Sequence, residues 1–129
     1  MRAPVVRFRI DFAEHSRIGP GKICLLEAIR DSGSLSQGAR NIGMSYRRAW
    51  LLVESLNQSF REPVTVSSTG GRSGGGMLIT DFGDALIKSY RDLERDFETL
   101  AARRLRTVIA AVIGHSKSDA KTSIRANLD

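Results

Sequence analysis

Two adjacent arginines at the start of a predicted helix are the residues whose type and spacing point most directly to chemistry. Arg47 and Arg48 follow Tyr46 and Ser45, and the serine hydroxyl is expected to cap the helix. An arginine can donate two hydrogen bonds to the acceptors of one guanine, and the major groove of B-DNA admits one α-helix. Ser45, Tyr46, Arg47 and Arg48 are therefore candidate DNA-contacting residues.

A second polar group precedes the arginines, at the start of a shorter predicted helix. Ser34, Ser36 and Gln37 fit a capping box, in which Ser34 accepts from the N–H three residues on and Gln37 reaches back to the N–H of Ser34. Hydroxyl, amide and backbone N–H donors at the positive end of a helix dipole can also hold a phosphate. We expect these residues to hold a DNA duplex in position through its phosphates. The alternative is that they only cap the helix.

The glycine-rich segment 69–76 is a third candidate. A phosphate-binding P-loop needs a lysine followed by serine or threonine after the second glycine, opening a helix, whereas Gly76 is followed by Met77 and a predicted strand. Arg72 and Ser73 therefore suit a hairpin tip, or wing, that lies along the DNA backbone or minor groove. The alternative is a hairpin without a partner.

The elements that must position these residues follow from periodicity. The pattern predicts a strand over 5–12, helices over 22–32, 35–42 and 45–60, a hairpin of strands 64–67 and 77–79, and a helix over 82–113. Ala39, Gly43 and Ala49 stand where two helices joined by a tight turn must approach closely. Such a pair favours a DNA-binding helix-turn-helix, and the alternative is an ordinary helical hairpin within a core. Trp50 is predicted to lie in the core.

The last helix carries an apolar stripe at spacings of four and three residues. So long a helix cannot be covered by so small a domain, and its far end should bury the stripe on a second copy. A homodimer is expected, and a monomer with an exposed stripe is the alternative. The candidate interface residues are Leu86, Tyr90, Leu93, Phe97, Leu100, Leu105, Val108 and Val112.

Length and composition indicate a small, basic, single-domain protein. The 129 residues suit one small domain, and twenty Lys and Arg against fourteen Asp and Glu give a net charge of +6, which favours a polyanion as partner. Residues 1–61 hold ten basic and five acidic side chains, so the first half should face that partner. The single cysteine, Cys24, excludes an internal disulfide and is predicted to be buried.

Other kinds of site are not expected. The sequence contains no catalytic constellation, so we expect no enzyme, no metal site and no cofactor. It shows neither a membrane-spanning segment nor a signal peptide, so a soluble, cytoplasmic protein with no membrane partner is expected.

Four segments resemble one family of regulators. Residues 32–39 (SGSLSQGA), 43–50 (GMSYRRAW), 69–76 (TGGRSGGG) and 78–80 with Gly83 are similar to the N-terminal domain of the molybdate-dependent transcriptional regulator ModE, and so to the helix-turn-helix of LysR-type regulators. The resemblance spans about residues 20–100. It implies a winged helix-turn-helix that reads promoter DNA as a dimer through long helices. Because the sequence stops soon after the last helix, a stand-alone bacterial DNA-binding form without a molybdate site is expected.

The predicted fold is thus mainly α with a small β-hairpin wing (α+β): a winged helix-turn-helix over 1–80, a dimerisation helix over 81–113 and a flexible tail over 114–129. The predicted function is sequence-specific binding of double-stranded DNA and regulation of transcription. Two alternatives stay open at this point. One is a protein-interaction adaptor that docks another regulator, and the other is a nucleoid-type protein that binds DNA regardless of sequence.

Overall fold

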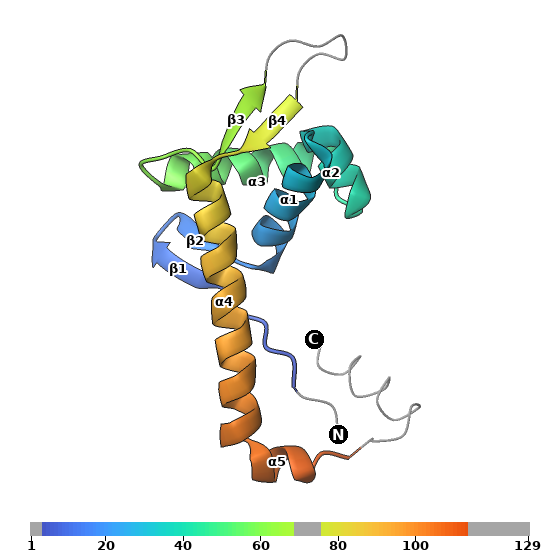
Figure 1. Cartoon of the computed structure of the whole chain (residues 1–129), viewed down its shortest axis with the longest axis vertical. Helices are drawn as coiled ribbons and strands as arrows, with labels where there is room; N and C mark the ends of the chain where they lie inside the picture. The colour runs from blue at the N-terminus through green and yellow to red at the C-terminus, as the bar shows by residue number, and fades with distance from the viewer. Residues whose placement is uncertain (1–3, 69–75, 114–129) are drawn as a thin grey trace. The chain divides into compact units, whose positions relative to one another are not determined.

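The computed structural model of the chain describes residues 4–68 and 76–113 (Figure 1). These residues contain both helices and short antiparallel strands. In chain order the elements are β1 (Ile10–Ala13), β2 (Ser16–Ile18), α1 (Pro20–Ser32), α2 (Leu35–Asn41), α3 (Tyr46–Ser59), β3 (Thr65–Ser68), β4 (Gly76–Ile79), α4 (Asp81–Arg104) and α5 (Arg106–Ala110).

The chain divides into two compact units, and the division falls within α4. One unit comprises residues 7–93 and holds β1 to β4, α1 to α3 and most of α4. The other comprises residues 1–6 and 94–129, of which 4–6 and 94–113 are described. The predicted division into segments 1–80, 81–113 and 114–129 stays a prediction, and its tail lies outside the described residues.

The unit of residues 7–93 has two neighbouring apolar clusters, and α1 contributes to both. Helix α1 begins with Pro20, whose fixed φ suits a first helical position, and its buried side chains recur at helical spacing. The first cluster joins α1 to α3, α4 and the strands, and contains Ile18, Ile23, Leu26, Leu56, Val64, Ile87 and Tyr90. The second joins α1 to α2 and α3, and contains Leu25, Ile29, Leu35, Ala39, Ala49 and Val53.

The two hairpins form separate two-stranded antiparallel sheets. In the first, Ile10 pairs with Ile18 and Asp11 with Arg17, and an irregularity follows. In the second, the register runs regularly from Thr65 opposite Ile79 to Ser68 opposite Gly76. The first hairpin adds a sheet that the sequence did not predict.

Polar side chains fix the second hairpin to the helices. The side-chain oxygen of Asn57, on α3, accepts from the N–H of Val64 at 2.7 Å and from that of Thr65 at 3.3 Å. The hydroxyl of Thr80 donates to the carbonyl of Pro63 at 2.7 Å and accepts from the N–H of Gly83 at 3.0 Å, so it caps α4. The hairpin is thereby held to the end of α3 and the start of α4.

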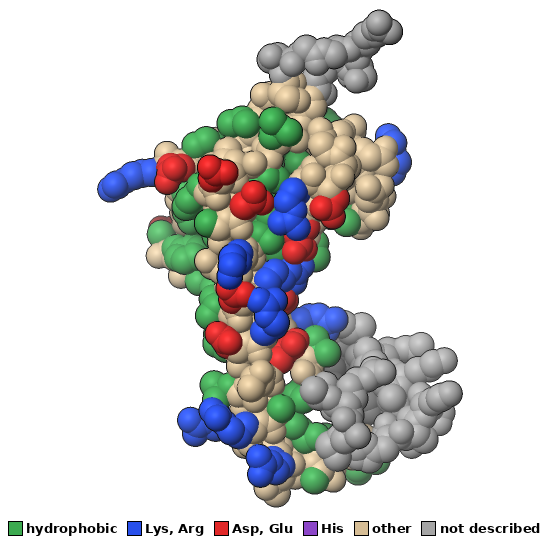
Figure 2. Space-filling view, in the orientation of Figure 1, with side chains coloured by type: hydrophobic (Ala, Val, Ile, Leu, Met, Phe, Trp, Pro, Cys, Tyr) green, Lys and Arg blue, Asp and Glu red, His purple; other side chains and the backbone are tan. Residues whose placement is uncertain are grey.

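Charged side chains gather along the visible side of α4 in Figure 2. Arg91 donates through Nε and Nη2 to the two carboxylate oxygens of Glu27 on α1, at 3.0 and 2.6 Å. This hydrogen bonding lowers the pKa of Glu27, against the opposing effect of burial, and the nearby charges of Arg91 and Arg30 lower it further. A forked ion pair of this kind fixes the orientation of α4 against α1.

The structure corrects the predicted fold class. We expected one hairpin and one uninterrupted last helix in a winged helix-turn-helix. The described residues instead contain two separate antiparallel sheets, and the last helix stops at Arg104, since Leu105 has φ −102° and ψ 19° and α5 begins after it. The fold is therefore an α+β arrangement with two small sheets, and the winged-helix assignment is withdrawn.

Several residues also lie elsewhere than predicted. The first strand begins at Ile10 rather than at residue 5, and Phe8 stacks on Tyr90 with ring centroids 4.5 Å apart. Tyr90 is fully buried and donates to the carbonyl of Phe8 at 2.7 Å, so it packs inside one copy and cannot form a dimer interface. Cys24 is only half-buried, with its sulfur 3.6 Å from Nη2 of Arg91.

Candidate nucleic-acid interface

The start of α2 places three of the predicted residues together. The Ser34 hydroxyl accepts from the N–H of Gln37 at 3.1 Å, which confirms the predicted cap, and it lies 3.2 Å from the Ser36 hydroxyl. The second predicted bond of the capping box, from the N–H of Ser34 to the Gln37 side chain, is wrong, because this N–H donates to the Ser32 hydroxyl instead. The Gln37 amide donates to Asn41 at 2.7 Å.

Close packing of α2 on α1 fixes the direction of this start. A Cβ on Gly38 would lie 3.0 Å from the backbone nitrogen of Ile29 and 3.1 Å from the carbonyl carbon of Ala28. A side chain at this position would force the two backbones apart by a few tenths of an ångström, whereas glycine allows the close approach without a shift. Ala39, next along the helix, is also buried. The polar residues of α2 therefore stay on its exposed side.

A tight turn then leads into α3. Gly43 has φ +70°, a left-handed conformation that glycine adopts at little cost, and its N–H donates to the carbonyl of Arg40 at 3.2 Å. The Ser45 hydroxyl accepts from the N–H of Arg48 at 3.1 Å, which confirms the predicted cap. Ala49 is buried, so the first turn of α3 presents its other residues outward.

The outward side of α3 carries aromatic and cationic side chains. Tyr46, Arg47, Trp50 and Leu51 line an open hollow of about 470 Å³. Trp50 is 47% exposed, so the prediction that it belongs to the core is wrong. The buried positions of α3 are Ala49, Val53 and Leu56, and Trp50 lies about 100° around the helix from the first of these.

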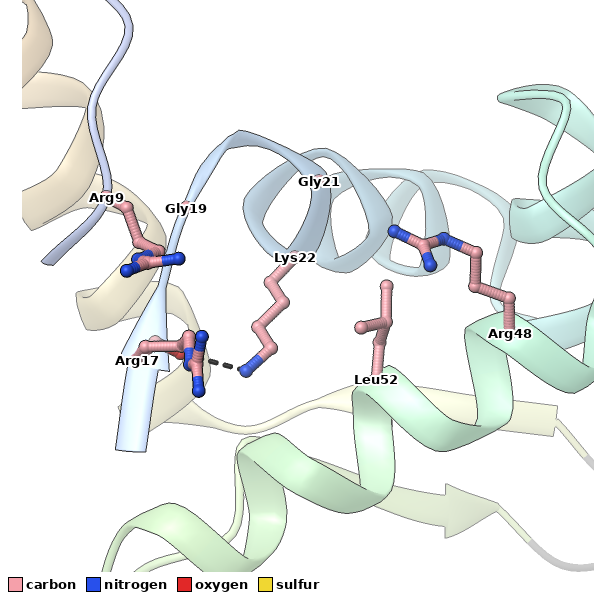
Figure 3. A pocket seen from close by; sticks show the side chains of 7 residues that line it. All are labelled: Arg9, Arg17, Gly19, Gly21, Lys22, Arg48 and Leu52. Atoms are coloured by element: carbon pink, nitrogen blue, oxygen red, sulfur yellow. Dashed lines mark hydrogen bonds between the residues drawn. The ribbon is translucent and has the colours of Figure 1, made fainter. Parts of the chain in front are cut away.

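The side chain of Arg48 lines a different hollow, between α3, the start of α1 and β2 (Figure 3). This cationic hollow, of about 160 Å³, is lined by Arg9, Arg17, Gly19, Gly21, Lys22, Arg48 and Leu52. Burial, followed by the charge of Arg17, lowers the pKa of Lys22. No motif in the sequence pointed to Arg9, Arg17 or Lys22 as site residues; the excess of basic residues in the first half was their only signal.

The strands of the second hairpin pack beside these helices. The N–H of Met77 donates to the carbonyl of Gly33 at 2.9 Å, and the N–H of Gly76 donates to the Ser68 hydroxyl at 2.9 Å. The first bond holds β4 against the end of α1, and the second joins β4 to β3. The predicted DNA-contacting residues Arg72 and Ser73 lie outside the described residues, and their role stays a prediction.

The proposed dimer residues divide into two groups. Leu86 packs on the core around α1 and Leu93 is half-buried. Apolar side chains in the unit that contains residues 94–113 are more exposed than Leu86 and Leu93. Val108, for example, is 59% exposed. The exposed side chains of the predicted stripe are Phe97, Leu100, Leu105, Val108 and Val112.

Two further features concern residues 4–68 and 76–113, namely a metal-ion site and a membrane-spanning helix. No group of three or more His, Cys, Asp or Glu side chains in these ranges could hold a metal ion. None of their helices is both long and apolar enough to cross a membrane.

Comparisons with known proteins point to molybdenum-related proteins and transcriptional regulators. No protein family profile matches the chain. It is 33% identical to the molybdenum transport protein ModE of Azotobacter vinelandii over 99 residues, covering 77% of this chain and 37% of that protein. It is 36% identical to the DNA-binding transcriptional dual regulator ModE of Escherichia coli over 113 residues, covering 82% and 42%.

A third relative is the molybdenum-pterin-binding protein MopA of Rhodobacter capsulatus, which is 42% identical over 78 residues, covering 60% of this chain and 29% of that protein. The chain thus spans less than half the length of each of these three relatives. It is similar to transcriptional regulators, as the sequence analysis expected.

These relatives correct two expectations. The chain was identified as a stand-alone N-terminal DNA-binding domain, and a molybdate site was excluded. The relatives include proteins named for molybdenum transport and for molybdenum-pterin binding. The relatives therefore do not support assignment of the chain to an N-terminal DNA-binding domain, and the expectation of no molybdate site is contradicted.

Proposed function

We propose that the chain regulates transcription by binding double-stranded DNA, and that it acts as a binding protein rather than an enzyme. The observation that carries this proposal is the exposed first turn of α3, with Arg47 beside Tyr46 and with Ser45 as its cap. A capped helix with exposed arginine and aromatic side chains suits the major groove, where arginine can bond guanine and apolar groups can contact the thymine methyl.

The residues of the interface divide by their roles in this proposal. Tyr46 and Arg47 would meet base edges, with Trp50 available for contact further along the groove. Ser34, Ser36 and Gln37 at the start of α2 would contact phosphates through hydroxyl and backbone groups. Base contacts specify a sequence, whereas phosphate contacts set the register of the protein on the duplex.

Substitution of one arginine tests the interface. Arg47→Ala should weaken binding to a preferred site, selected from random duplexes, by about 1 to 3 kcal/mol and should relax the preference for guanine. Fluorescence anisotropy with specific and scrambled duplexes measures both effects. The matched control is Arg61→Ala, an exposed arginine beyond the end of α3.

Three outcomes decide between this proposal and its rivals. Equal affinity of the wild-type protein for all duplexes indicates a nucleoid-type binder, and no binding at physiological salt indicates an adaptor. Binding that Arg47→Ala leaves unchanged contradicts the assignment of α3. Genuine duplex binding should also weaken with salt, with a logarithmic slope of about 0.9 for each phosphate neutralised.

Exposed apolar residues on α4, on α5 and beside α5 support action as a homodimer. Five apolar side chains of the predicted stripe, from Phe97 to Val112, are each at least 36% exposed, and their burial on a second copy would remove them from water. Light scattering should give twice the chain mass of 14.2 kDa. Leu105→Asp should return the mass to that of one chain, whereas Val66→Asp, an exposed position on β3, should not. A wild-type mass of one chain contradicts the dimer.

The relatives favour a second candidate, the binding of a molybdenum-containing anion. Such an anion would be held by cations and N–H donors, which the cationic hollow offers, rather than by the carboxylates and thiolates that hold metal cations. Calorimetric titration with sodium molybdate tests it, and sodium sulfate at equal ionic strength is the control. Heat that saturates only with molybdate supports this candidate.

A further inference from the structure

The cationic hollow brings together four positive side chains from four positions along the chain. Arg9 precedes β1, Arg17 is on β2, Lys22 is in the first turn of α1 and Arg48 is in the first turn of α3. All seven lining residues are either cationic, glycine or leucine, so no acidic side chain lines the hollow (Figure 3). Such a concentration of like charge is costly unless an anion offsets it.

Among the residues that the structure describes, Asp11 is the acidic group with an ion pair to this cluster. Its carboxylate accepts from Nε of Arg9 at 2.8 Å and from Nη2 at 3.1 Å. In the backbone register of the hairpin, Asp11 stands opposite Arg17. One carboxylate against four cations leaves the cluster with a net positive charge. Asp11 therefore orients Arg9 without neutralising the hollow.

Lys22 is the most confined of the four cations. Its ammonium donates to the carbonyl of Arg17 at 2.9 Å and to the hydroxyl of Ser55 at 3.3 Å. An ammonium has three N–H donors, so one donor remains beyond these two bonds. Burial and the charge of Arg17 both disfavour its charged form, which a bound anion would stabilise.

The first turn of α1 adds donors of another kind at the same place. Gly19 precedes the helix and provides no side-chain cap, and Pro20 has no N–H. The backbone N–H groups of Gly21 and Lys22 therefore lack the serine or aspartate oxygen that often caps a helix start. A Cβ on Gly21 would meet nothing within 4 Å, so access to this turn is open.

We propose that the cationic hollow binds one phosphate-type oxyanion. The ligand class follows from the lining: forked guanidinium groups, an ammonium and helix N–H groups match tetrahedral oxygens. No aromatic ring lines the hollow to stack on a base, and about 160 Å³ suits a small anion rather than a whole nucleotide. Such an anion can come from two sources: it is either a phosphate of the DNA backbone or a free oxyanion in solution.

The position of Arg48 favours the DNA backbone as the source. Its neighbour Arg47 lines the open hollow on the other side of α3, so the two arginines serve different contacts. Where Arg47 meets base edges, Arg48 reaches a phosphate that flanks the groove, together with Arg17 and Lys22. This division rests on the proposed DNA binding, whereas binding of a free oxyanion does not depend on it.

The site is tested first with inorganic phosphate and the full chain. In ¹H–¹⁵N NMR spectra, phosphate should shift the backbone signals of Gly21 and Lys22 saturably, and chloride at equal ionic strength should not. Arg17→Gln should weaken the phosphate affinity about tenfold, as expected for one charge-assisted hydrogen bond. Arg61→Gln, the matched control outside the hollow, should leave it unchanged. The absence of a saturable shift, or equal effects of both variants, overturns the proposal.

Measurements of DNA binding by the same variants distinguish the two sources of the anion. If the hollow holds a DNA phosphate, Arg17→Gln lowers affinity for specific and scrambled duplexes alike and reduces the salt slope by about 0.9, while Arg61→Gln does not. If both variants bind DNA equally but phosphate or molybdate still saturates the site, the ligand is a free oxyanion. If the wild-type protein binds phosphate but no duplex, the proposed DNA binding fails and the oxyanion site stands.

Discussion

Asn57 should contribute more to the stability of this fold than any neighbouring polar residue on α3. Its side chain accepts from the N–H groups of Val64 and Thr65 and donates to the Thr65 hydroxyl at 3.0 Å. Val64 is fully buried and Thr65 is 4% exposed, so water cannot replace these bonds without opening the hairpin. Asn57→Ala removes the shared acceptor of the N–H groups of Val64 and Thr65, at a cost of about 1 to 3 kcal/mol, and loses the bond to the Thr65 hydroxyl, worth about 1 kcal/mol more.

We therefore expect Asn57→Ala to lower the free energy of unfolding by about 2 to 4 kcal/mol. Urea unfolding followed by circular dichroism measures this loss, and an unchanged m-value shows that the unfolding transition itself is unaltered. Gln58→Ala is the matched control, because the Gln58 amide is exposed and donates only locally to Glu54. It should change stability by less than about 0.5 kcal/mol. Equal losses in both variants would refute the reasoning.

Two further predictions concern the turn before α3 and the ion pair of α1. Gly43→Ala should cost about 1 to 2 kcal/mol in urea unfolding, because the left-handed φ of +70° is strained for alanine although the space around it is open; an unchanged stability would contradict the turn geometry. Arg91 lowers the pKa of Glu27, so the stabilisation from this pair is complete above the ordinary value near 4.5 and disappears as the pH falls through the lowered pKa. Glu27→Gln should flatten that part of the pH–stability curve, whereas Glu54→Gln should leave it unaltered.

The local elements around the interface were predictable because their signals are local. A serine marks the start of both α2 and α3 in the sequence, and a glycine marks the end of α2. Ser34 and Ser45 make the capping bonds that their positions predict. Trp50 was misplaced because a large aromatic residue is usually buried. Its angle around α3 decides otherwise, since it shares the side of Tyr46 rather than that of Ala49.

The sequence by itself determined several short-range features of this protein: the serine caps of α2 and α3, the turn at Gly43 and the excess of positive charge in the first half. Only the tertiary structure decided that Tyr90 packs under Phe8 and that Arg9, Arg17, Lys22 and Arg48 line one hollow. Capping and periodicity depend on residues three or four positions apart, which a sequence displays directly. The cationic hollow depends on how a hairpin and two helices pack, and contacts between distant segments leave no periodic trace along the chain.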